Sequence, residues 1–138
     1  MLAQAIGAEV WVKHENATPT GAFKVRGGLV YMDRLKRDQP GIAGVISATR
    51  GNHGQSLALA GTRSGRSVTI VVPHGNSREK NAAMRAFGAE LIEHGRDFDE
   101  AKDEAYRLAG ERDAIFALIF GVGVLALPLW VWVSGRWN

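Results

Sequence analysis

The 138-residue chain contains no cysteine, which excludes a disulfide framework and a cysteine-ligated zinc site. Its four histidines are scattered without the short spacings of histidine ligands, so no metal is expected. The seventeen basic and fourteen acidic residues are interspersed, and no basic and aromatic cluster indicates nucleic-acid binding. What remains is a chain with 46% hydrophobic residues, long enough to bury one ordinary core.

The amino terminus has no basic cluster followed by an apolar core, so no secretory signal is predicted. Charge is absent from residues 114–135, a length above the ~20 residues that a bilayer-spanning helix needs. Three interpretations stay open: a buried strand and helix, a membrane anchor interrupted by Pro128, or the end of a truncated or frame-shifted sequence, which we favour. We therefore divide the chain into an α/β domain over residues 1–113 and an apolar tail over residues 114–138.

Apolar periodicity in the first part alternates between the strand and helix patterns. Strands are predicted at residues 9–14, 44–47, 67–72 and 90–93, and helices at residues 24–37, 54–63, 77–87 and 97–110. Gly65 and Gly88 are placed to end helices, Asn76 or Ser77 can cap the helix that runs to residue 87, and Asp97 with Glu100 has the spacing of a capping box. Strands separated by helices predict the α/β class, with βαβ units in three layers around a mostly parallel sheet.

Two glycine-rich segments carry the chemical information. Residues 19–28, PTGAFKVRGG, place Lys24 in a turn of small residues that opens a helix. Residues 47–55, SATRGNHGQ, follow an apolar strand and open the next helix. A lone lysine beside glycines is usually only an exposed residue at the start of a helix. The second segment adds a further signal, because its glycines let backbone N–H groups bind an anion at a helix N-terminus.

Together these segments resemble the pyridoxal 5′-phosphate (PLP) enzymes of the fold-type II, tryptophan-synthase β-like family, and within it the threonine and serine dehydratases. The resemblance runs from residue 7 to residue 110 and fades beyond. It implies PLP as cofactor and L-threonine or L-serine as a small amino-acid substrate, converted to a 2-oxo acid and ammonia. It also implies a cytoplasmic enzyme, and a homo-oligomer when full length.

The resemblance also implies roles for residues of both segments. Lys24 is the catalytic residue: it binds PLP covalently and then removes the α-proton, which requires an unprotonated amine whose pKa burial or a nearby cation lowers. Phe23 packs on one face of the PLP ring, and Asn52 hydrogen-bonds the cofactor's 3′ oxygen. The substrate carboxylate is held, mainly by backbone groups, at Thr49, Arg50, Gly51, Asn52 and His53.

Departures from the family pattern limit these implications. Arg50 stands where related racemases carry a serine as second base, which favours elimination over racemisation. The glycine-rich loop for the PLP phosphate and the partner of the pyridine nitrogen lie further along in those enzymes and are not found here. We therefore expect a fragment with the lysine half of a composite site. An inactive or membrane-associated fragment, and a related β-eliminating PLP enzyme for another hydroxy amino acid, stay open as alternatives.

Overall fold

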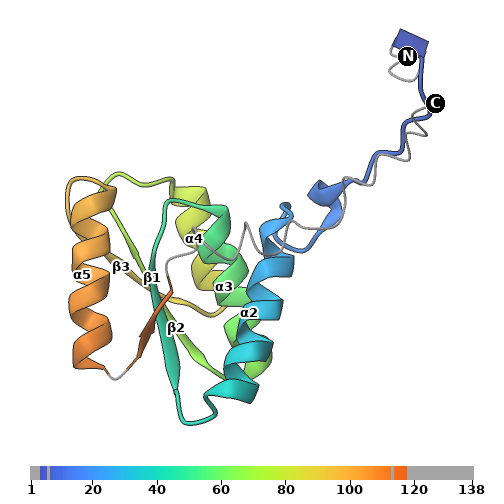
Figure 1. The fold of residues 1–138 in the computed structure, drawn as a ribbon. Helices are drawn as coiled ribbons and strands as arrows, with labels where there is room; N and C mark the ends of the chain where they lie inside the picture. Colours follow the sequence, from blue (N-terminus) through green and yellow to red (C-terminus); the bar gives the residue numbers. More distant parts are fainter. Residues whose placement is uncertain (1–3, 6, 113, 118–138) are drawn as a thin grey trace.

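The computed structural model describes residues 4–5, 7–112 and 114–117, and over these it is a three-layer α/β domain (Figure 1). This confirms the predicted fold class. In chain order the elements are the 3-10 helix η1 (Glu15–Ala17), α2 (Lys24–Asp38), β1 (Gly44–Ala48), α3 (Asn52–Ser64), β2 (Ser67–Val72), α4 (Arg78–Ala86), β3 (Glu90–Glu93), α5 (Phe98–Glu111) and β4 (Ile115–Phe116).

The sheet has the order β3-β2-β1-β4, and its paired strands run parallel. Helices α2, α3 and α4 lie on one side of it and α5 on the other (Figure 1). After β3 the chain crosses by α5 to the far side of β1, so the strand order reverses between β1 and β4. In open parallel sheets such a reversal leaves a crevice at the carboxyl ends of the strands, where ligands bind.

Two apolar clusters fill the spaces between the layers. On the α2, α3 and α4 side the cluster centres on Met32, Leu57, Ile70 and Met84, each at most 1% exposed. On the α5 side, Ala101 and others of its alanines allow the helix to lie close to Ile46 and Val71. Burial of β1 and β2 on both faces explains their nearly continuous apolar sequences, which are typical of central parallel strands.

Capping residues confirm three of the predicted helix ends, whereas α3 begins at Asn52, two residues before its predicted start. Gly65 follows α3 in the left-handed conformation, with φ 71°. The Ser77 side chain accepts the Lys80 N–H at the start of α4. Asp97 accepts the N–H groups of Asp99 and Glu100 at the start of α5. These contacts satisfy backbone groups that a helix end otherwise leaves without partners.

The strand predicted at residues 9–14 is wrong. This segment has no strand pairing, and Trp11 and Val12 are 88% and 63% exposed. Alternating apolar residues fit an extended segment with one apolar and one polar face. A β-strand also requires a neighbouring strand that pairs with its backbone N–H and C=O groups. The fourth strand is instead Ile115–Phe116, which pairs with Val45 and Ile46.

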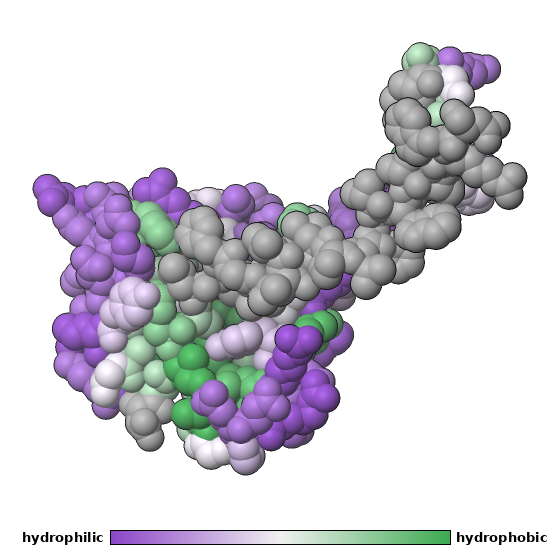
Figure 2. All heavy atoms as spheres, viewed as in Figure 1, coloured by the Kyte–Doolittle hydropathy of each residue, from purple (hydrophilic) through white to green (hydrophobic). Residues whose placement is uncertain are grey.

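Apolar surface remains around this edge strand. Figure 2 shows hydrophobic side chains gathered between α5 and α2, with hydrophilic ones over α5. Ile115 and Phe116 are only half-buried at the β4 edge. Among the described residues no helix is both long and apolar enough to cross a membrane. The interpretations of residues 118–138, including Pro128, lie outside the described part, and the division between residues 113 and 114 stays a prediction.

Candidate active site

The two glycine-rich segments meet at the carboxyl end of β1. Helices α2 and α3 run side by side in the same direction, and Lys24 and Asn52 are their first residues. The Ser56 hydroxyl donates to the Lys24 carbonyl at 2.6 Å and ties the two helix starts together. A Cβ on Gly28 would lie 2.8 Å from the Ser56 carbonyl oxygen, so the glycine permits this close approach.

A compact turn fixes the direction in which α2 begins. Thr18 Oγ1 accepts the Ala22 N–H and donates to the Ala22 carbonyl, both at 2.9 Å. Gly21 has φ 63°, a left-handed conformation that favours glycine. Thr20 is buried and donates to the same Ala22 carbonyl at 3.2 Å. The small residues of this segment therefore form the turn that delivers Phe23 and Lys24 to the helix start.

Lys24 is half-buried, and its Nζ lies 5.5 Å from the centroid of the Phe23 ring. This places the amine over an aromatic face, within the range of a cation–π contact. Phe23 is 53% exposed, so part of its side chain is accessible to a ligand. Arg26, the nearest cation in sequence, is paired with Glu15 at 3.2 Å.

The second turn presents backbone donors. Thr49 is buried, and its hydroxyl accepts the Gly51 N–H at 3.2 Å. Gly51 is the N-cap of α3 and has no side chain to cap it. Among the described residues no acceptor meets the N–H groups of Asn52, His53 and Gly54. The start of α3 therefore has the free donors and the positive dipole end that bind a carboxylate or phosphate.

His53 joins this turn to the strand β4. Its Nε2 lies 3.2 Å from the fully buried Ser47 hydroxyl, which donates to the Ala117 carbonyl at 2.6 Å. Since Ser47 has a single proton and gives it to Ala117, the serine accepts from a His53 ring protonated at Nε2. Burial, together with the charge of Lys24, lowers the pKa of His53 to about 4. The ring is therefore neutral near pH 7.

The structure thus brings together most of the predicted site residues. Lys24 and Phe23 lie at one helix start, and Thr49, Gly51 and His53 at the adjacent one. Asn52 and Arg50 belong to the same turn, but both side chains are exposed. Sequence reasoning did not assign Ser56, which fastens the two starts together. Ser56 lies four residues after Asn52, and this spacing places both residues on one side of α3. That spacing is the one feature of the sequence that points to Ser56.

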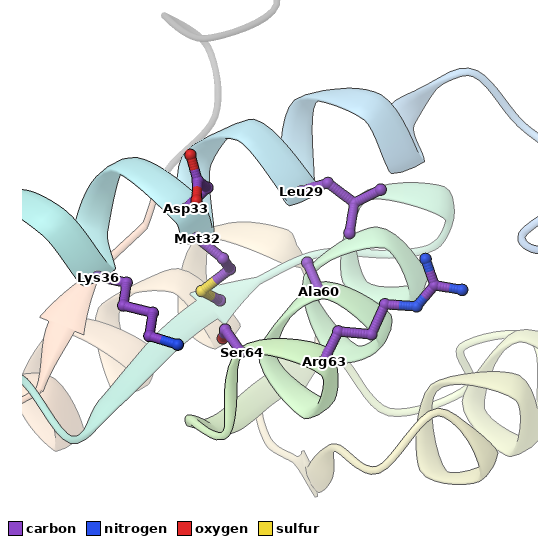
Figure 3. Close-up of a pocket in the computed structure, with 7 residues that line it drawn as sticks. All are labelled: Leu29, Met32, Asp33, Lys36, Ala60, Arg63 and Ser64. Atoms are coloured by element: carbon purple, nitrogen blue, oxygen red, sulfur yellow. The ribbon is translucent and has the colours of Figure 1, made fainter.

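The site is separate from the groove in Figure 3. That pocket has a volume of about 200 Å³ and lies between α2 and α3. The side chains that line it are Leu29, Met32, Asp33, Lys36, Ala60, Arg63 and Ser64. None of the predicted site residues is among them. Cations such as Lys36 are favourable there because the carboxyl-terminal end of a helix carries a partial negative charge.

Fold and site together define an α/β domain with an amine beside a turn that presents free backbone N–H groups. Comparison with known proteins gives the family: residues 1–122 match the family described as pyridoxal-phosphate-dependent enzymes. This chain belongs to that family.

Several relatives are similar over most of this chain. The biosynthetic L-threonine dehydratase of Haemophilus influenzae is 36% identical over 93% of the chain, and the L-threonine ammonia-lyase of Thermotoga maritima is 34% identical over 94%. The processed threonine deaminase isoform 2 of Solanum lycopersicum has a similar structure, with a TM-score of 0.76 and 33% identity over 85% of the chain. The chain spans only 26%, 34% and 34% of these three proteins.

Proposed function

We propose that this chain provides the lysine part of a PLP-dependent lyase that converts L-threonine or L-serine to a 2-oxo acid and ammonia. The observation that carries the proposal is the half-buried Lys24 over the Phe23 ring, beside the uncapped start of α3. Support comes from relatives named threonine dehydratase and ammonia-lyase. A cytoplasmic location and a homo-oligomeric full-length enzyme belong to the same proposal.

The residues present fit PLP. Lys24 Nζ is the amine for its aldehyde, the accessible part of Phe23 is the platform for its ring, and the exposed Asn52 amide is the partner for its 3′ oxygen. When bound, PLP supplies an electron sink at the substrate's α-carbon. The N–H groups at the start of α3 bind the substrate carboxylate. Lys24 Nζ would then take the α-proton, and the β-hydroxyl would leave as water with a proton that the resulting Lys24 ammonium supplies.

A racemase is the second candidate, because a PLP-dependent aspartate racemase has a TM-score of 0.73 and 35% identity over 76% of this chain. Arg50 favours elimination, since a guanidinium stays protonated and does not serve as a second base. Product analysis separates the two: elimination releases ammonia, and racemisation releases the D-amino acid.

The test is turnover of L-threonine in the presence of PLP by two proteins, the chain itself and the chain extended with the remaining part of a related threonine dehydratase. We expect the extended protein to release ammonia and 2-oxobutanoate. The 138-residue chain is expected to release neither, because a cofactor without its phosphate-binding loop is poorly fixed relative to the substrate.

Lys24→Ala in the extended protein is the matched control, and it is expected to remove the activity. Equal turnover with and without Lys24 would contradict the proposal. Equal turnover by the short and the extended proteins would instead show that the fragment interpretation is wrong.

A further inference from the structure

Helix α4 packs against the start of α3 through a glycine at each of two contacts. A Cβ on Gly54 would lie 2.3 Å from the Met84 sulfur, so Met84 occupies the space that a side chain would need. Lys80 precedes Met84 by four residues and lies on the same side of α4. A Cβ on Gly51 would lie 3.1 Å from both Cδ and Nζ of Lys80. The lysine side chain therefore lies along the Gly51 turn.

This ammonium group has no anionic partner in the described part of the chain. Elsewhere in the described part of the chain, some basic side chains do pair with carboxylates: Arg37 lies 3.1 Å from Asp33, and Arg85 of α4 itself lies 3.6 Å from Glu93. Among the described residues neither Lys80 nor Arg50 forms such a pair. An unpaired cation thus lies next to backbone donors that are also without acceptors.

We propose that Lys80 provides the positive charge that binds the substrate's carboxylate at the Gly51 turn. This inference rests on the proposed function and deepens it, because it names a further binding residue and the substrate class that the residue selects: free α-amino acids. The carboxylate lies between the N–H groups of Asn52 and His53 and the Lys80 ammonium. An amide or ester in its place carries no charge and loses the ionic contact.

The glycine at position 51 leaves room for the Lys80 side chain. The Gly51 φ of −176° lies outside the left-handed region that favours glycine. A side chain at this position would meet the Lys80 methylenes and ammonium. Glycine keeps the lysine close to the helix start, where the dipole and the ammonium act on the same anion.

The test uses the 15N-labelled full chain without cofactor, titrated at low ionic strength with L-threonine and separately with L-threoninamide. We expect L-threonine to shift the amide resonances of Gly51 and Asn52, and L-threoninamide to shift them far less. Lys80→Gln is expected to weaken L-threonine binding about fivefold, the effect of a solvent-exposed ion pair. Lys80→Arg keeps the charge and is expected to bind within about twofold of the unchanged chain.

Arg78→Gln is the matched control, because Arg78 lies two residues earlier on α4, where its side chain projects from a different side of the helix. It removes one charge and is expected to leave binding unchanged. Equal weakening by Arg78→Gln and Lys80→Gln, unchanged binding in Lys80→Gln, or no shift with the unchanged chain would each overturn the proposal. Since no PLP is present, the result is independent of whether Lys24 binds the cofactor.

Discussion

His53 is a partly buried, neutral residue in the first turn of α3, and its lowered pKa has a consequence for stability. The pKa falls from its ordinary value of 6.5 to about 4 in the folded chain, because burial disfavours the charged ring. Between these values the unfolded chain binds more protons than the folded one, so the free energy of unfolding falls as the pH falls. The contribution is complete above pH 6.5 and is lost between about pH 6.5 and pH 4.

We expect the free energy of unfolding to decrease by about 2 kcal/mol from this group between pH 7.5 and pH 5. Urea unfolding at the two pH values measures the decrease. His53→Gln is the control, since glutamine keeps an N–H donor for Ser47 but does not titrate. The same pH dependence in the variant would show that His53 is not the group responsible.

Single residues also show what the sequence could and could not predict about the site. Lys24 and Asn52 were assigned from the two motifs that resemble the family, and the structure shows each of them as the first residue of a helix. Ser47 and Ala117 are seventy residues apart, and their hydrogen bond depends on the strand order. Lys80 reaches Gly51 only through the packing of α4 on α3, which no local pattern encodes.

At the scale of elements, the contact between α3 and α4 depends on Gly54. Its hypothetical Cβ lies 2.3 Å from the Met84 sulfur and 2.6 Å from Thr49 Cγ2, both on buried residues. We expect Gly54→Ala to lower the free energy of unfolding by about 1–3 kcal/mol, the usual effect of overpacking. Circular dichroism during urea unfolding measures this loss.

Gly27→Ala in α2 is the matched control, because a Cβ at that position has no neighbour within 4 Å. Alanine there is expected to raise the free energy of unfolding by about 0.5–1 kcal/mol, since it restricts the unfolded chain and favours the helix. If Gly54→Ala were as stable as Gly27→Ala, the close packing of α4 on α3 would be contradicted.

Elements differed in how far their sequences determined them. The strand β2 was predictable from its β-branched run, and α4 and α5 from Ser77 and Asp97, because a cap acts within one turn of the helix. The error at residues 9–14 has the opposite cause. Alternating apolar residues fit a strand, but pairing depends on a neighbour elsewhere in the fold, which the described residues do not provide.

For the whole molecule, the order of the strands explains why the site lies where it does. The reversal between β1 and β4 places the turn after β1 beside Ala117, and His53 spans the two through Ser47. The α/β class was predictable from the rhythm of strands and helices. The position of β4 beside β1 was not, because only two of its residues pair and they begin a long apolar run.

The central claim is that Lys24 holds PLP, and covalent labelling tests it most directly. The full chain is incubated with PLP, reduced with borohydride, digested, and its labelled peptide is identified by mass spectrometry. We expect the label on Lys24, because its amine lies over the Phe23 ring, and no label at this peptide in Lys24→Ala. Label spread over Lys13, Lys36 and Lys80 without preference for Lys24 would contradict the account.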